Sequence, residues 1–246
     1  MADSDRRPAY YSARPGGWRD WWSILHPPYT AWHLSYVVIG ASLAPHLDSV
    51  RLLATLLAFF AAVGIAAHAL DERQGHPLRT HIPDAQRDRH GQSGAGLAVA
   101  IALGVVGVSR VGWVLLPFIV VGPILVVAYN LELFGGRVHT DVGFAAAWGA
   151  FPLLTGYVAQ AGRLDAAAVI AAFGAFALSY AQRSLSTPAR LIRRHVTRVD
   201  GALILDDGTL RQLDEETLLA PLERALRWLS WAVVALALAL LVARLT

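Results

Sequence analysis

The stretch from Ala66 to Asp84 changes, within one helical turn, from an apolar run to a cluster of charged and imidazole side chains. His68 lies three residues before Asp71, and Glu72 follows directly, so helical spacing puts the three side chains on one side of the chain. An imidazole and two carboxylates that face a cavity can hold a divalent cation or act as a general acid and base. We therefore predict catalytic and metal-binding roles for this cluster. A solvated helix end is the alternative interpretation.

A second polar cluster lies where another apolar run ends, in the stretch AYNLELFGGRVHTD. Glu132 lies four residues before Gly136, just as Asp71 lies four residues before Gly75, so the two run ends are alike. The carboxylates predict metal ligation by Glu132 and Asp141, with Glu132 also catalytic. The other polar members of the cluster are predicted to bind phosphate: Asn130, Arg137 and His139. A hairpin loop after a helix end is the alternative.

A third cluster follows in the stretch SYAQRSLSTPARLIRR, residues 179–194. The planar fork of an arginine can bond two phosphate oxygens at once, so Arg183 and Arg190 are predicted to bind phosphate, with Tyr180 beside them. Amide and hydroxyl groups accompany them at Gln182, Ser184, Ser186 and Thr187. Arg193 and Arg194 are expected to anchor on lipid headgroups. A lone histidine in the first apolar run, His33, is expected to hydrogen-bond a neighbouring helix.

Apolar segments long enough to cross a membrane must position these clusters. The chain has 246 residues, of which 55% are hydrophobic and 16% are charged, and a mean hydropathy of +0.45. Continuous apolar runs without alternation exclude a β-barrel. Because a spanning helix needs roughly 20 apolar residues, we predict an all-α integral membrane protein, a bundle of about seven transmembrane helices around a central cavity. The predicted spans are 29–45, 51–70, 94–108, 111–131, 141–160, 166–182 and 226–245.

The chain is predicted to have four parts. They are an aromatic arm at the membrane interface (1–28), a core of six spans (29–183), a cytoplasmic insert (184–225) and the last span (226–246). Within the insert, turn signals at Asp200-Gly201 and Asp207-Gly208 flank the residues ALIL and predict a small β-hairpin or meander. An amphipathic helix, broken or started near Pro221, is expected to lead into the last span.

The distribution of arginine predicts how the chain is oriented. All 21 basic residues are arginine, and with seven spans 17 of them fall on one side. By the positive-inside rule, the N-terminus and the charged loops are cytoplasmic and the C-terminus is outside, in the cytoplasmic (inner) membrane. Topology therefore accounts for the net charge of +3, and no nucleic-acid partner is expected.

The layout of the clusters resembles the UbiA-type intramembrane prenyltransferases. The stretch AHALDERQG is similar to that family's first Asp-rich motif, in which Asp71 matches an aspartate of the motif. The stretch HPLRTHIP, which includes Arg79, is similar to the basic, proline-containing continuation of that motif. The stretch from Ala128 to Gly162 looks like the loop and fifth helix of the family. The resemblance implies a helical bundle in which Mg²⁺ and a prenyl diphosphate bind at the cytoplasmic face. The family's second Asp-rich motif falls at residues 180–188, where this chain has no carboxylate.

The resemblance implies a metal-assisted transferase that acts on a prenyl diphosphate or a related lipid phosphate. Mg²⁺ is the expected cofactor, and the predicted metal ligands are Asp71, Glu72, Glu132 and Asp141. Arg183 and Arg190 could neutralise phosphate in place of the missing second motif. Two alternatives stay open. One is a metal-dependent lipid hydrolase or cyclase on the same scaffold, and the other is a lipid-binding or assembly protein that retains a degenerate pocket.

Overall fold

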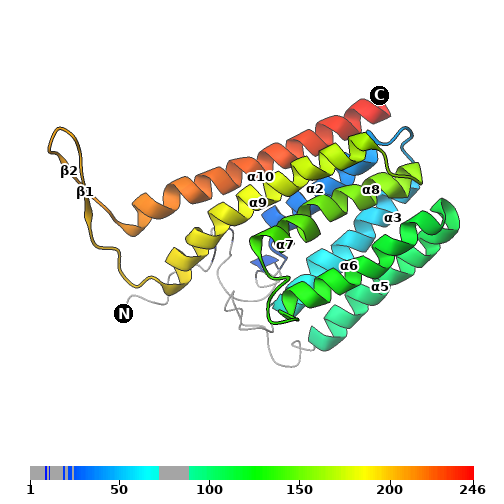
Figure 1. Ribbon diagram of the computed structural model, residues 1–246, viewed down its shortest axis with the longest axis horizontal. Helices are drawn as coiled ribbons and strands as arrows, with labels where there is room; N and C mark the ends of the chain where they lie inside the picture. The colour runs from blue at the N-terminus through cyan, green and yellow to red at the C-terminus, as the bar shows by residue number, and fades with distance from the viewer. Residues whose placement is uncertain (1–8, 10, 12–18, 20–21, 24, 72–88) are drawn as a thin grey trace.

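The computed structural model describes residues 9, 11, 19, 22, 23, 25–71 and 89–246, and for Asp71, Arg89, His90 and Gln92 it describes the backbone only. Seven helical segments form one bundle (Figure 1). In chain order they are α2 (Pro27–Leu43); α3 (Ser49–Phe59) with η1 (Phe60–Ala67) and α4 (His68–Asp71); α5 (Arg89–Val111); η4 (Trp113–Leu115) with α6 (Leu116–Asn130); α7 (Asp141–Ala145) with η5 (Ala146–Ala150) and α8 (Phe151–Ala161); α9 (Ala166–His195); and α10 (Glu215–Leu245).

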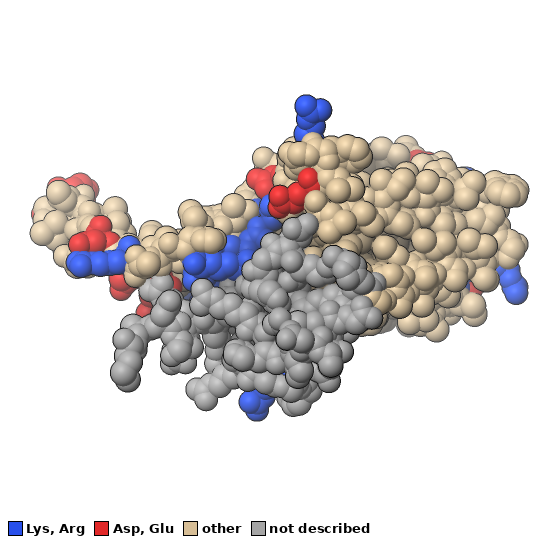
Figure 2. Space-filling view, turned by 90° about the horizontal axis from the view of Figure 1, so that it is seen from below, with Lys and Arg blue, Asp and Glu red and all other residues tan. Residues whose placement is uncertain are grey.

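The predicted helical bundle is confirmed in its main features. Six of these segments are long and apolar enough to cross a membrane, from Ser49–Leu70 through to Glu215–Leu245. The seventh, α2, has 17 residues and packs between α8 and α10. Figure 2 shows that the bundle surface on one side is mostly uncharged, whereas charged side chains gather toward the end that carries the hairpin. We call this the hairpin end: α2 begins there, residues 131–140 join α6 to α7 there, and α9 leads from there into β1.

The segment predicted as an insert, residues 184–225, differs from its prediction at both ends. Helix α9 continues through Pro188 to His195, and α10 runs unbroken from Glu215 through Pro221, so the predicted boundaries at 183/184 and 225/226 fall inside helices. A proline removes one helical hydrogen bond, but packing can outweigh that loss. The two helices pack against each other beyond the rest of the bundle, where Arg193 Nη2 donates to Glu223 Oε2 over 2.7 Å (Figure 1).

The predicted β-hairpin is present and joins these two helices. Strand β1 (Ala202–Ile204) pairs antiparallel with β2 (Leu210–Gln212), with Leu203 opposite Arg211. Gly208, with φ 81°, supplies the left-handed residue of the turn. All six strand residues are exposed, so the hairpin adds nothing to the bundle core.

Helices α2 and α8 cross at very short range, and two glycines make this possible. A Cβ atom on Gly40 would lie 2.0 Å from the carbonyl oxygen of Leu153, and one on Gly156 would lie 2.3 Å from that of Val37. Such close approach is the usual way for membrane helices to gain packing contacts. The crossing fixes α2, which carries His33, against the fifth helical segment.

Two helical segments change locally to π-helical hydrogen bonding, at η1 and at η5. Such π turns interrupt the ordinary ladder and often occur at functional sites. Both lie at the level where the polar clusters meet. At the opposite end of the bundle, the Asp48 backbone N–H donates to Gln160 Oε1 over 2.7 Å, and Arg51 Nη2 donates to the carbonyl of Arg110 over 2.9 Å. These bonds tie α3 to its neighbours far from the predicted site.

Candidate functional site

A cavity of about 640 Å³ opens at the hairpin end, and we call it the polar cavity. Its walls come from residues before α2, from α2, η1 with α4, the end of α6 with the 131–140 loop, α7 with η5, α9 and α10. Six of the residues predicted for the site line it together: His68, Asn130, Glu132, His139, Arg183 and Arg190. Side chains up to 122 residues apart in the sequence therefore meet in one space.

The other predicted residues lie elsewhere or outside the described chain. Tyr180 is 42% exposed and is not part of the cavity wall, because its position on α9 points outward from the bundle. Arg137 is also exposed and away from the wall. Glu72, Arg79 and the side chain of Asp71 fall outside the described residues, so their predicted roles stay predictions.

Three histidines of the cavity wall are held by backbone carbonyls in the same way. The Nδ1 atoms of His33, His68 and His139 lie 2.8, 3.1 and 3.0 Å from the carbonyl oxygens of Trp148, Gly64 and Tyr129. A carbonyl oxygen only accepts, so Nδ1 carries the proton in each ring and Nε2 is the acceptor nitrogen. The Nε2 atom of His139 lies 3.4 Å from Arg183 Nη2, in agreement with an acceptor nitrogen at this position.

The hydrogen bond predicted between His33 and a neighbouring helix is confirmed by its contact with Trp148. Sequence reasoning did not place His33 at the site, and the structure puts it in the cavity wall, 6% exposed. The signal available in the sequence was a lone histidine inside an apolar run.

The arginines of the cavity differ in how their charge is compensated. Arg183 Nε donates to Asp141 Oδ1 over 2.9 Å, and its guanidinium lies 5.5 Å from the ring centre of Phe144. Arg193 pairs with Glu223. Within the described chain, Arg190 has no carboxylate at ion-pair distance, although it is only partly exposed and lies near Arg183 and Arg194. A buried cation without a counter-charge favours an anionic ligand.

The start of the chain contributes a further imidazole that sequence reasoning missed. His26 stacks on His68 with ring centres 4.5 Å apart, and Tyr11 Oη lies 2.6 Å from His26 Nδ1. Burial lowers the pKa of His26 well below its ordinary value of 6.5, and the nearby His68, Arg194 and Arg190 lower that pKa further. His26 therefore stays neutral at pH 7 and covers one side of the cavity.

The predicted metal ligands are only partly brought together. Glu132 Oε1 lies 3.9 Å from His139 Nδ1, whereas Asp141 is engaged by Arg183. Among the residues that the structure describes, no three acidic, histidine or cysteine side chains form a metal-binding group. A Mg²⁺ site of oxygen ligands would therefore depend on Asp71 and Glu72. Asp141 is not among the residues that line the polar cavity, and its Oδ1 accepts from Arg183, so its predicted role as a metal ligand stays a prediction.

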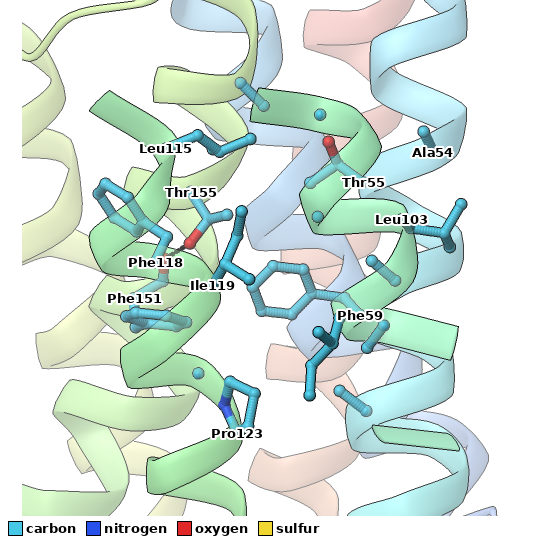
Figure 3. Close-up of a pocket in the computed structure, with 18 of the residues that line it drawn as sticks. Ala54, Thr55, Phe59, Leu103, Leu115, Phe118, Ile119, Pro123, Phe151 and Thr155 are labelled. Atoms are coloured by element: carbon cyan, nitrogen blue, oxygen red, sulfur yellow. Dashed lines mark hydrogen bonds between the residues drawn. The ribbon is translucent and has the colours of Figure 1, made fainter. Parts of the chain in front are cut away.

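A second cavity, of about 450 Å³, lies between α3 with η1, α5, α6 and α8, and we call it the apolar cavity (Figure 3). Phe59, Phe118 and Phe151 line it, and the ring centre of Phe151 lies 6.2 Å from that of Phe59 and 5.7 Å from that of Phe118. The hydroxyls of Thr55 and Thr155 bond carbonyls of their own helices, so both are satisfied within the wall. Such a wall suits a hydrocarbon chain.

The two cavities adjoin each other. Val63 of η1 and Trp148 of η5 line both of them, so the two π-helical segments form the partition. A cationic space next to an apolar one suits an amphiphile with an anionic head group and an apolar chain.

No family model, no curated protein and no solved structure matches this chain. The assignment of a function therefore depends on the residues and their geometry alone.

Proposed function

We propose that the protein is an integral membrane transferase, similar to the UbiA-type prenyltransferases, that acts on a prenyl diphosphate or a related lipid phosphate. Its seven helices span the cytoplasmic membrane, with the hairpin end in the cytoplasm and the C-terminus outside. Large apolar side chains exposed on the bundle support this arrangement, because lipid would cover them. Examples are Val105, Ile170, Phe173 and Leu236, which are 58 to 71% exposed.

The observation that carries the proposal is that Arg190, in the polar cavity beside the apolar cavity, has no carboxylate at ion-pair distance among the residues that the structure describes. A phosphate would supply the missing negative charge through charge-assisted hydrogen bonds. The apolar cavity would receive the prenyl chain, with its first carbons near Trp148. Arg183 is positioned by Asp141 and would contribute a second guanidinium at the same phosphate group.

In such a transfer, the bond between the prenyl C1 and the diphosphate oxygen breaks, and its electron pair leaves with the diphosphate. Arg190 and Arg183 would stabilise the negative charge that develops on the leaving group. The acceptor forms the new bond to C1 and loses a proton, for which the Nε2 atom of His33 or His68 is a suitable base. Mg²⁺ held by Asp71, Glu72 and Glu132 would add positive charge at the diphosphate.

Binding of radiolabelled farnesyl diphosphate to the full chain in lipid nanodiscs tests the proposal. Arg190→Gln should weaken binding by about 10- to 100-fold, since hydrogen bonds between charged partners contribute about 1.5–3 kcal/mol. The control is Arg198→Gln, because Arg198 is exposed and pairs with Asp200 on the hairpin side. Binding that is equal in the two variants would place the diphosphate elsewhere. Pyrophosphate release that stops with a chelator would support the metal-assisted transferase.

A lipid-binding protein without catalysis is the second candidate. It is favoured by the wall of α9, where residues 180–188 present amide and hydroxyl groups instead of carboxylates. Tight binding of farnesyl diphosphate without pyrophosphate release, with or without Mg²⁺, would favour this candidate. Release of inorganic phosphate from the diphosphate would instead indicate a hydrolase.

A further inference from the structure

Four uncharged hydrogen-bonding side chains that line the polar cavity are buried, whereas the arginines that line it are partly exposed. Gln182, Ser186, His33 and Asn130 are 2 to 8% exposed. The arginines are only half-buried, and His195 at the edge is exposed. Two carboxylates also line the cavity, but Glu132 is exposed and Glu223 is paired with Arg193. A ligand group that contacts the four buried side chains should therefore be neutral and polar.

The side-chain amide of Gln182 needs a hydrogen-bonding partner from a ligand or water. It is 2% exposed, and its Oε1 atom has no hydrogen-bond partner within the described chain. A buried amide that lacks a partner costs free energy unless a ligand or water supplies one. Because Gln182 lines the polar cavity, a ligand in the cavity can supply the missing partner.

The spacing along α9 defines the length of the ligand. Gln182, Ser186 and Arg190 are four residues apart and line the same cavity, so they form one row on the helix. At a rise of 1.5 Å per residue, the row is about 12 Å long. A ligand with phosphate at Arg190 would reach Gln182 through a group about the size of a six-membered ring. Hydroxyl groups on that ring can both donate to and accept from the amide and the serine.

We propose that the polar cavity binds a sugar or cyclitol phosphate, with its phosphate at Arg190 and its ring hydroxyls at Ser186 and Gln182. This inference rests on the proposed function, since it uses the same phosphate site. The proposed function names a prenyl diphosphate or a related lipid phosphate as the substrate. The present inference specifies that the head group of this lipid phosphate contains a hydroxylated ring. The cavity of about 640 Å³ is of the size that encloses such a ligand.

The test compares two probes with the same carbon ring and charge, myo-inositol 1-phosphate and cyclohexyl phosphate, by titration calorimetry on the full chain in nanodiscs. The wild type should prefer the inositol phosphate by about 3- to 10-fold, the effect of one or two hydrogen bonds to neutral groups. Gln182→Leu should remove this preference, and Ser184→Ala should keep it, because Ser184 is exposed on the same helix and bonds the carbonyl of Tyr180. Thermal unfolding of each variant checks that the fold is retained.

The outcomes separate this inference from the proposed function. Equal affinities of the wild type for the two probes would overturn the hydroxyl site, while a loss of both affinities in Arg190→Gln would keep the phosphate site. No binding of either probe would overturn this inference, whereas the proposed function is overturned only if farnesyl diphosphate binding is also unaffected by Arg190→Gln. A further arm uses vesicles with phosphatidylinositol to distinguish a lipid-borne head group from a free one. Tighter binding of the lipid, lost in Ala58→Phe of the apolar cavity, would identify the lipid-borne form.

Discussion

The Nδ1 atom of His33 lies 2.8 Å from the carbonyl oxygen of Trp148, and so α2 is hydrogen-bonded to the π-helical turn of the fifth segment. His68 is held in a similar way, 3.1 Å from the carbonyl oxygen of Gly64 in the other π-helical turn. A π turn disrupts the regular ladder and makes carbonyl groups available to side chains. The two irregular segments thus orient two imidazoles toward one cavity.

This contact predicts a difference between two substitutions of His33. His33→Leu should lower the free energy of unfolding in detergent by about 1–3 kcal/mol, because it leaves the carbonyl of Trp148 buried without a donor. His33→Asn should cost less, since its amide N–H can replace Nδ1–H. The exposed His195 serves as the control through His195→Leu, which should change the stability little. Equal losses for the two His33 variants would show that ring packing, and not the hydrogen bond, is what matters.

The close crossing of α2 and α8 predicts that Gly40 does not tolerate a methyl group. Gly40→Ala would place Cβ 2.0 Å from a backbone oxygen, so we expect a loss of at least 1–3 kcal/mol from the strain of overpacking. The matched control is Gly174→Ala on α9, where a Cβ atom meets nothing within 4 Å. That variant should gain up to about 1 kcal/mol from its higher helix propensity. Thermal unfolding of both proteins in the same detergent measures the difference, and a stable Gly40→Ala would contradict the observed crossing.

The lowered pKa of His26 predicts how stability depends on pH. The unfolded chain binds a proton near 6.5, whereas the folded chain binds it only at lower pH. Between these values the unfolded state holds more protons, so His26 stabilises the fold above pH 6.5 and loses this contribution as the pH falls. His26→Asn should reduce the slope of unfolding free energy against pH by up to about 1.4 kcal/mol per pH unit, the value for one proton. Asparagine suits the φ of 45° at this position.

Denaturant unfolding at pH 7.5, 6.5, 5.5 and 5.0 measures that slope. The comparison with His195→Asn accounts for general effects of removing a histidine. Identical slopes for the wild type and His26→Asn would show that the burial of His26 is not maintained in solution.

The apolar cavity predicts a dependence on chain length. Ala58→Phe would fill part of this cavity and should weaken the binding of geranylgeranyl diphosphate more than that of dimethylallyl diphosphate. The reason is that only the longer chain needs the inner part of the cavity. Leu53→Phe is the control, because Leu53 is 58% exposed on the same helix and does not line the cavity. An equal effect of Ala58→Phe on the two diphosphates would place the prenyl chain elsewhere.

The sequence by itself determined the helical class, the approximate helix positions and the β-hairpin. Long apolar runs leave few alternatives to helices, and the two Asp-Gly turn signals bracket the short strand Ala202–Ile204. The sequence also predicted that polar residues at the ends of the apolar segments, including Glu132 and Arg190, contribute to the site. These are local properties, since composition and spacing within about 20 residues contain them.

Only the tertiary structure decided which of these residues meet. The pairing of Arg183 with Asp141, the stacking of His26 on His68 and the entry of His33 into the cavity wall all join separate helices. The continuation of α9 past Pro188 also depends on packing against α10. Such contacts depend on how helices cross and on which side chain lacks a partner, and no local pattern encodes either. For the same reason, only the packed bundle shows that, among the residues described, Gln182 Oε1 has no hydrogen-bond partner and Arg190 has no carboxylate at ion-pair distance.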